Sequence, residues 1–189
     1  ELYPEAETDT EVFHKLMGGG LYPIHKADGM WSGVRRFPDE RAFAFTDYLS
    51  QKPLYYSVKY KMIASEPDAF RCFKLTPDMA HIGNCIKWGY DPTGRTPWKE
   101  VKQLPAGHWI GKDMIPTPYW NWKYIHTPND LKKAFRRSVK NRLVSDQPIA
   151  MLLSGGLDST LTFKIAQELG ANLKVFHRTP LILPVVQFL

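Results

Sequence analysis

Hydrophobic and polar positions divide the chain into two parts with different patterns. In the first two thirds, short apolar or aromatic runs alternate with turn-like polar segments such as residues 37–40. This alternation predicts strands over residues 30–34, 41–45, 54–58 and 62–64. An early helix is predicted over residues 10–17, because three consecutive glycines follow it. The Pro- and Gly-rich segment 89–118 predicts a long loop and an extended connection.

The pattern becomes helical after about residue 127. Thr127, Pro128 and Asp130 form a favourable helix start. Apolar residues then recur at helical spacing, at Leu131, Ala134, Phe135, Val139 and Leu143. Lysines and arginines occupy the other faces, and we interpret them as the solvent side of an amphipathic helix rather than a nucleic-acid surface. A domain boundary is expected within residues 120–127.

A strand-helix-strand unit follows, which is the seed of a parallel sheet. The apolar run 149–153 predicts the first strand, residues 158–169 the helix and residues 173–176 the second strand. Gly170 ends the helix. The unit therefore predicts an α/β arrangement in the last third of the chain.

The turn between that first strand and its helix reads Ser154-Gly155-Gly156-Leu157-Asp158-Ser159. A Gly-rich turn that leads into a helix N-terminus suits a phosphate, because backbone N–H groups and the helix dipole both favour an anion there. Asp158 would repel phosphate unless Mg²⁺ lay between them. No lysine occurs from residue 149 to 163, which excludes the G-x-x-x-x-G-K-[ST] phosphate loop.

Composition and charge narrow the class of protein only slightly. The chain has 189 residues, 43% of them hydrophobic, and a net charge of +6 that is spread along the sequence. Its two cysteines, Cys72 and Cys85, have no zinc-like spacing, which favours a reduced, cytoplasmic setting. We expect no membrane segment, because no signal peptide is visible and the apolar tail 181–189 is too short to span a bilayer.

The S-G-G-x-D-S loop is the signature of N-type ATP pyrophosphatases, and the rest of the chain resembles glutamine-dependent asparagine synthetases of the bacterial type. The resemblance covers about residues 1–177. The matching motifs are Thr8-Asp9-Thr10-Glu11-Val12, Asp28-Gly29-Met30, Asp47 with Lys52-Pro53-Leu54-Tyr55-Tyr56, Ala64-Ser65-Glu66, Leu104-Pro105-Ala106-Gly107-His108 and Tyr119-Trp120.

The resemblance implies two domains. Residues 1–122 would form an α+β, Ntn-hydrolase-like glutaminase domain, and residues 123–189 the start of an α/β parallel-sheet ATP pyrophosphatase domain. It also implies a reaction in which glutamine supplies ammonia, ATP and Mg²⁺ activate aspartate as an aspartyl-adenylate, and asparagine, AMP and pyrophosphate are released. A homodimer is compatible with the family.

The resemblance also assigns residues. Asp9 would bind the α-amino group of glutamine, and Asp158 would hold Mg²⁺. The residues expected to contact ATP or pyrophosphate are Leu152, Ser154, Gly155, Gly156, Asp158 and Ser159. The apolar strand residues Leu152 and Leu153 are equally explained by burial in a sheet.

The chain departs from the family pattern in two places, and these departures leave other interpretations of its function open. The N-terminal cysteine nucleophile of the family is not found in this chain, and residues 177–189 do not match the family pattern. We therefore expect a chain without the front of the glutaminase domain and with an incomplete second domain. The alternatives are a same-fold enzyme with another acceptor, such as a β-lactam-forming relative, and a truncated non-catalytic paralogue.

Overall fold

The computed structural model describes residues 8–17, 24, 27–38, 41–121, 131–177 and 186–188, with the backbone alone for Asp9 and for residues 186–188. The chain separates into two compact units, residues 1–123 and 124–189. The expected helix start at 127–130 and most of the expected boundary segment lie outside the described residues. Each unit is treated below by itself.

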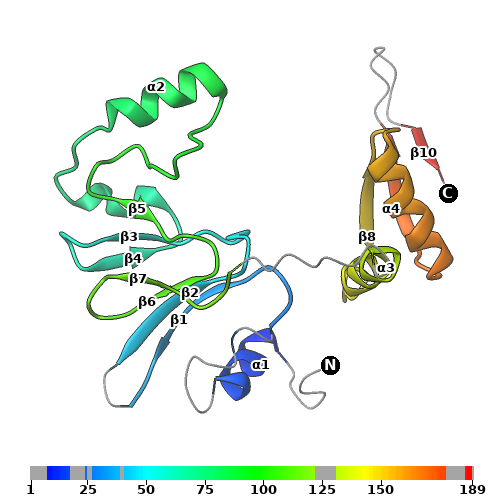
Figure 1. Cartoon of the computed structure of the whole chain (residues 1–189), viewed down its shortest axis with the longest axis horizontal. Helices are drawn as coiled ribbons and strands as arrows, with labels where there is room; N and C mark the ends of the chain where they lie inside the picture. The colour runs from blue at the N-terminus through cyan, green and yellow to red at the C-terminus, as the bar shows by residue number, and fades with distance from the viewer. Residues whose placement is uncertain are drawn as a thin grey trace. The chain divides into compact units, whose positions relative to one another are not determined.

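The first unit contains two antiparallel sheets (Figure 1). One has the strand order β1-β2-β6-β7, and the other has the order β4-β3-β5. The strands are β1 (Ser32–Arg36), β2 (Ala42–Thr46), β3 (Tyr55–Ser57), β4 (Met62–Ala64), β5 (Lys102–Gln103), β6 (His108–Ile110) and β7 (Pro116–Pro118). The helices are α1 (Asp9–Leu16), the 3₁₀ helix η2 (Pro67–Cys72) and α2 (Met79–Trp88).

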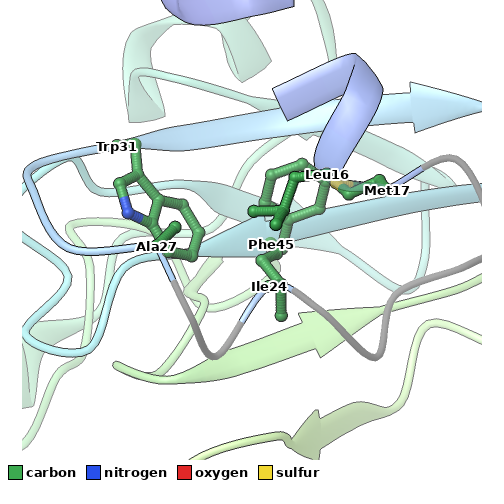
Figure 2. Close-up of a cluster of buried hydrophobic side chains, with 6 residues drawn as sticks. All are labelled: Leu16, Met17, Ile24, Ala27, Trp31 and Phe45. Atoms are coloured by element: carbon green, nitrogen blue, oxygen red, sulfur yellow. The ribbon is translucent and has the colours of Figure 1, made fainter. Parts of the chain in front are cut away.

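Aromatic and aliphatic side chains from α1 and the larger sheet form the first core. Figure 2 shows Phe45 of β2 beside Leu16 and Met17 at the end of α1, with Trp31 and Ala27 nearby. The ring of Phe13 meets the ring of Trp31 edge-on, with 5.0 Å between centroids. These contacts explain why the early helix forms, since burial of one face stabilises a helix that is too short to be stable alone.

A second core in this unit lies between the two sheets. It contains Leu54, Tyr56, Leu104 and Ile110, all at most 6% exposed. Leu104 and Ile110 belong to the segment for which the sequence predicted a long loop. That prediction was wrong in part, because residues 89–118 contain β5, β6 and β7. The strand prediction at residues 62–64 is confirmed, and the other three predicted strands fall within two residues of β1, β2 and β3.

The second unit contains a three-stranded sheet of order β10-β9-β8, in which β8 and β9 are parallel. Its strands are β8 (Ile149–Leu153), β9 (Leu173–His177) and β10 (Val186–Phe188). Its helices are α3 (Leu131–Asn141) and α4 (Leu157–Glu168). The strand-helix-strand prediction is confirmed to within one residue at each end.

Both helices of the second unit contribute to one core. Val139 of α3 packs with Ile165 and Ala166 of α4, and all three are at most 8% exposed. The basic residues of α3 are exposed, as expected for the solvent side of an amphipathic helix, and Arg136 pairs with Glu168 at 2.7 Å. Leu131, which the helical pattern placed on the apolar face, is instead 72% exposed. In the part of the chain that the structure describes, no helix is both long and apolar enough to cross a membrane.

Candidate functional site

The segment between β8 and α4 is a tight turn that needs a glycine. Gly155 has φ +81°, a left-handed conformation that side chains with a Cβ rarely adopt. The turn brings β8 directly into α4, whose first helical residue is Leu157. Residues 154–156 therefore lie at the carboxyl end of a parallel strand, where ligands bind in open α/β sheets.

Two serine hydroxyls meet at this turn. Ser154 Oγ lies 3.0 Å from Ser159 Oγ and accepts a hydrogen bond from the Gly156 N–H at 3.3 Å. Ser159 Oγ in turn donates to the Gly156 carbonyl oxygen at 3.1 Å. The structure thus brings together Ser154, Gly156 and Ser159, which the sequence predicted as one site.

The N-terminus of α4 is open to an anion. Its N-cap is Gly156, and no side chain caps the first turn. The first backbone N–H groups of a helix have no partner within the helix, and the helix dipole adds partial positive charge at that end. A phosphate group could accept hydrogen bonds from these N–H groups, as it does at other glycine-rich helix starts.

Asp158 is exposed in the first turn of α4. Its backbone carbonyl oxygen accepts a hydrogen bond from Thr162 Oγ1 at 2.8 Å. Its carboxylate makes no hydrogen bond or ion pair with another described residue. No group of three His, Cys, Asp or Glu side chains within the described ranges could hold a metal. A single free carboxylate beside a phosphate site nevertheless fits Mg²⁺, which binds proteins through one or two carboxylates plus substrate phosphates.

The sequence analysis did not identify His177 as part of this region. His177 ends β9, and its Nδ1 lies 2.7 Å from the carbonyl oxygen of Leu153. Because a carbonyl oxygen only accepts, Nδ1 must carry a proton, and in the neutral ring Nε2 then holds the lone pair. A Cβ added to Gly155 would lie 3.9 Å from the ring. The sequence did contain a signal for this contact, namely a histidine at the end of the second parallel strand. Adjacent parallel strands have their carboxyl ends at the same edge of the sheet, so this histidine lies near the turn that follows β8.

The two strand leucines differ in environment. Among the described residues, the Leu152 side chain is 81% exposed. Leu153, the next residue, is half-buried. Leu152 therefore lies on an exposed face of β8 among the described residues.

The second predicted region lies at the start of α1. Thr8 caps the helix, and its Oγ1 accepts a hydrogen bond from the Glu11 N–H at 3.2 Å. Asp9 is the first helical residue, but its side chain lies outside the described atoms. Beside α1 there is a cavity of about 500 Å³, which is lined by residues that include Thr10, His14, Trp31 and Lys52. A lining that combines aromatic and polar side chains suits a small polar ligand.

The turn after β2 carries the motif around Asp47, and Asp47 itself is fully buried. The Asp47 carboxylate accepts hydrogen bonds from four backbone N–H groups at 2.9 to 3.3 Å, those of Trp31, Leu49, Gln51 and Lys52. Burial alone would raise the pKa of this carboxyl, but these hydrogen bonds outweigh it and lower the pKa below its ordinary value of 3.8. Asp47 therefore organises the turn and has no oxygen left for a ligand.

The backbone at Gly107 explains why a second motif has a glycine at this position. It has φ +66°, and its N–H donates to the Asp47 carbonyl oxygen at 2.9 Å. A Cβ at this position would come within 3.3 Å of the Trp120 backbone. The glycine of the Leu104-Pro105-Ala106-Gly107-His108 motif is thus required by a close approach of backbone segments.

Comparison with known proteins matches both units. The family model described as glutamine amidotransferase domain matches residues 3–120, and the model described as asparagine synthase matches residues 130–179. A protein named asparagine synthetase [glutamine-hydrolyzing] 2 from Arabidopsis thaliana is 44% identical over 84% of this chain and 26% of its own length. A protein named putative asparagine synthetase [glutamine-hydrolyzing] 2 from Methanocaldococcus jannaschii is 27% identical over 88% of this chain and 36% of its length.

A third relative has a different name. The protein named amidase chyE from Penicillium rubens is 29% identical over 69% of this chain and 21% of its own length. The chain thus spans between about a fifth and about a third of these curated relatives. With a glutamine amidotransferase domain over most of the first unit and an asparagine synthase match in the second, the chain belongs to the family of glutamine-dependent asparagine synthetases.

Proposed function

We propose that the protein to which this chain belongs makes an amide from a carboxylic acid, with ATP as energy source and glutamine as nitrogen donor. The favoured acceptor is aspartate, which would be converted to asparagine through an aspartyl-adenylate with release of AMP and pyrophosphate. The observation that carries this proposal is the β8–α4 turn, in which two hydroxyls, an uncapped helix N-terminus and a free carboxylate lie together. The printed names of the relatives support the choice of reaction.

The chemistry explains why ATP is needed. A carboxylate is a poor electrophile, and an attached AMP group makes one of its oxygens a good leaving group. In this proposal the N–H groups of α4 and the hydroxyls of Ser154 and Ser159 hold the departing pyrophosphate. Asp158 would bind Mg²⁺, which would neutralise charge on the phosphates. Leu152 would contact the nucleotide.

The first unit is proposed to be the glutaminase domain, with an Ntn-hydrolase-like fold, and the second the start of the ATP pyrophosphatase domain. Asp9 would bind the α-amino group of glutamine. No nucleophile for glutamine hydrolysis is assigned within this chain. The homodimer and the cytoplasmic setting remain predictions from the family resemblance and from the cysteine content.

A second acceptor class has one observation in its favour. The Penicillium rubens relative is named an amidase rather than an asparagine synthetase, although its match covers much of the same chain. The loop that would hold pyrophosphate does not itself select the acceptor acid. An enzyme with the same first half-reaction and a different acceptor would therefore keep Ser154, Gly155, Gly156 and Asp158.

The nucleotide products test the proposal directly. The natural protein that carries this chain is incubated with ATP, Mg²⁺, ammonia and either aspartate or another carboxylic acid, and the nucleotides are separated. AMP and pyrophosphate are expected, with aspartate as the better acceptor. ADP as the main product would contradict the proposal, whereas AMP formation with a different preferred acid would favour the alternative acceptor class.

The nitrogen source separates the roles of the two units. An Asp9→Ala variant removes one partner of an ion pair to the glutamine ammonium group, so the glutamine KM should rise by about 100-fold or more. Synthesis from free ammonia should continue, since it does not use the glutamine site. If both nitrogen sources fail together, Asp9 stabilises the fold rather than binding substrate.

A further inference from the structure

A cysteine, a histidine and an aspartate form a hydrogen-bonded series at α2, within the first unit. Cys85 Sγ lies 3.4 Å from His81 Nε2, and His81 Nδ1 lies 3.2 Å from Asp91 Oδ2. Cys85 and His81 are four residues apart in α2 and therefore share one helix face. Asp91 comes from the loop that follows the helix. None of these residues belongs to the motifs that define the family resemblance.

The helix and its loop hold this arrangement in place. Asp78 caps the start of α2 by accepting from the Ala80 N–H at 3.0 Å, and Gly89 ends the helix in a left-handed conformation. Gly89 turns the chain back so that Asp91 reaches the face that carries His81. Asp91 Oδ1 is then fixed by Asn84 Nδ2 at 3.0 Å and by the N–H and hydroxyl of Thr93 at 2.8 and 2.6 Å.

Hydrogen-bond accounting fixes the tautomer of His81. Burial of Asp91 opposes ionisation, but hydrogen bonds from Thr93 and Asn84 and the nearby His81 lower its pKa to about 2. An ionised carboxylate only accepts hydrogen bonds, so His81 Nδ1 must carry a proton. In the neutral ring Nε2 then holds the lone pair, and this is the nitrogen that faces Cys85 Sγ.

The three residues of the series differ in their exposure to solvent. The Asp91 side chain is 2% exposed and that of His81 is 16% exposed, whereas Cys85 is partly exposed on a helix that has no fully buried residue. In Figure 1, α2 lies beyond β5 at the margin of the first unit. A small molecule can therefore approach the sulfur while the groups behind it stay shielded from water.

We propose that Cys85 is a nucleophilic thiol that forms mixed disulfides with small disulfide molecules, with His81 as its base and Asp91 as the residue that positions His81. A nucleophile within hydrogen-bond reach of a base that a third group orients is the arrangement that activates thiols. This modification site is independent of the amide synthesis proposed above.

The exchange reaction balances because the small disulfide is itself the oxidant of the Cys85 thiol. The proton of Cys85 Sγ passes to His81 Nε2, and the resulting thiolate attacks one sulfur of the small disulfide. A new S–S bond to Cys85 forms as the S–S bond of the reagent breaks, and the released thiolate takes the proton back from His81. Asp91 stabilises the imidazolium ion in the interval.

The chain contains its own control in Cys72. Cys72 is also a free thiol and is more exposed than Cys85, but its Sγ contacts only the Ala69 carbonyl oxygen at 3.5 Å among the described hydrogen bonds. The test treats the whole chain with dithiodipyridine, a small neutral aromatic disulfide, at neutral pH. Peptide mass spectrometry follows the two cysteines separately in the same sample.

We expect Cys85 to react at least ~10-fold faster than Cys72, because His81 Nε2 lies in place to accept the thiol proton as the sulfur attacks, and Cys72 has no such base among the described residues. Asp91→Asn should bring this ratio close to one. The amide NH₂ of asparagine would donate to His81 Nδ1, which moves the ring proton to Nε2 and removes the acceptor for the thiol. His81→Ala should have the same effect. Thermal unfolding of each variant shows whether it is folded.

Two results would overturn the proposal. One is a Cys85 to Cys72 ratio near one in the unaltered chain. The other is a high ratio that survives in Asp91→Asn or in His81→Ala, since the series would then be a purely structural link between α2 and its loop. If His81→Ala does not fold, the near-isosteric Asp91→Asn decides the question alone.

Discussion

Asp47 and Asp158 are both aspartates that follow a β-strand, yet their surroundings are opposite. Asp47 is completely buried, and four backbone N–H groups donate to its carboxylate. Asp158 is exposed, and its carboxylate has no partner among the described residues. The hydrogen-bonding capacity of the Asp47 carboxylate is used by its own turn, whereas the Asp158 carboxylate remains available to a ligand. Hydrogen-bond satisfaction therefore separates a structural aspartate from a candidate binding residue where residue type does not.

The first test of this comparison concerns the stability of the fold, where we expect the largest effect. Asp47→Ala leaves four backbone N–H groups without their acceptor, one of them buried and three partly buried, so the first unit should lose about 3 kcal/mol of unfolding free energy. Urea unfolding, followed by tryptophan fluorescence, measures the loss. Asp47→Asn keeps the shape and one acceptor oxygen and should lose less. An Asp47→Ala variant as stable as the parent chain would break the comparison.

The next effect concerns binding. Asp158→Asn should weaken binding of magnesium pyrophosphate by ~10–100-fold while leaving the unfolding free energy nearly unchanged, because the carboxylate supports no contact in the fold. Titration calorimetry with the magnesium complex gives the affinity. Asp146→Asn is the matched control, since Asp146 is also exposed and lies just before β8, at the strand end opposite to the turn. Equal losses of affinity in both variants would show that the effect comes from the change in net charge alone.

The smallest effect is a pH dependence. The folded-state pKa of Asp47 lies below its ordinary value of 3.8, so its contribution to stability is complete above that pH and is lost as the pH falls through the lower folded value. The stability difference between the parent chain and Asp47→Asn should therefore be constant near neutral pH and shrink below about pH 4. Urea midpoints across this range measure it. A difference that grows in acid would have the wrong sign for a lowered pKa.

Sequence reasoning worked best where one stretch contains both the pattern and its cause. The apolar run of β8, the glycine turn and the start of α4 all lie within residues 149–163, and the structure gives them nearly the predicted bounds. The same reasoning failed for β5, β6 and β7, which are two or three residues long. Such short strands are defined by partners far away in the chain, as when Trp109 pairs with Phe45.

The helix α2 was also missed, although its signals were present. Asp78 is a good N-cap, Gly89 is a good helix end, and Met79, Ile82 and Ile86 recur at helical spacing between them. Two other contacts were beyond the sequence alone. The approach of His177 to Leu153 requires the parallel register of β8 and β9, and the Cys85–His81–Asp91 series requires the chain reversal at Gly89.

The hydrogen bonds of Asp47 also have a consequence for the speed of unfolding. They join Asp47 to Trp31, sixteen residues earlier, and to Gly107 much later in the chain. Contacts between such distant segments require loop closure and form slowly, so this network should be completed late on the folding path. Interactions that are absent from the transition state govern the unfolding rate. The hydrogen bonds of Asp47 would then act mainly by slowing unfolding. A comparison of the folding and unfolding rates of Asp47→Asn with those of the parent chain can test this.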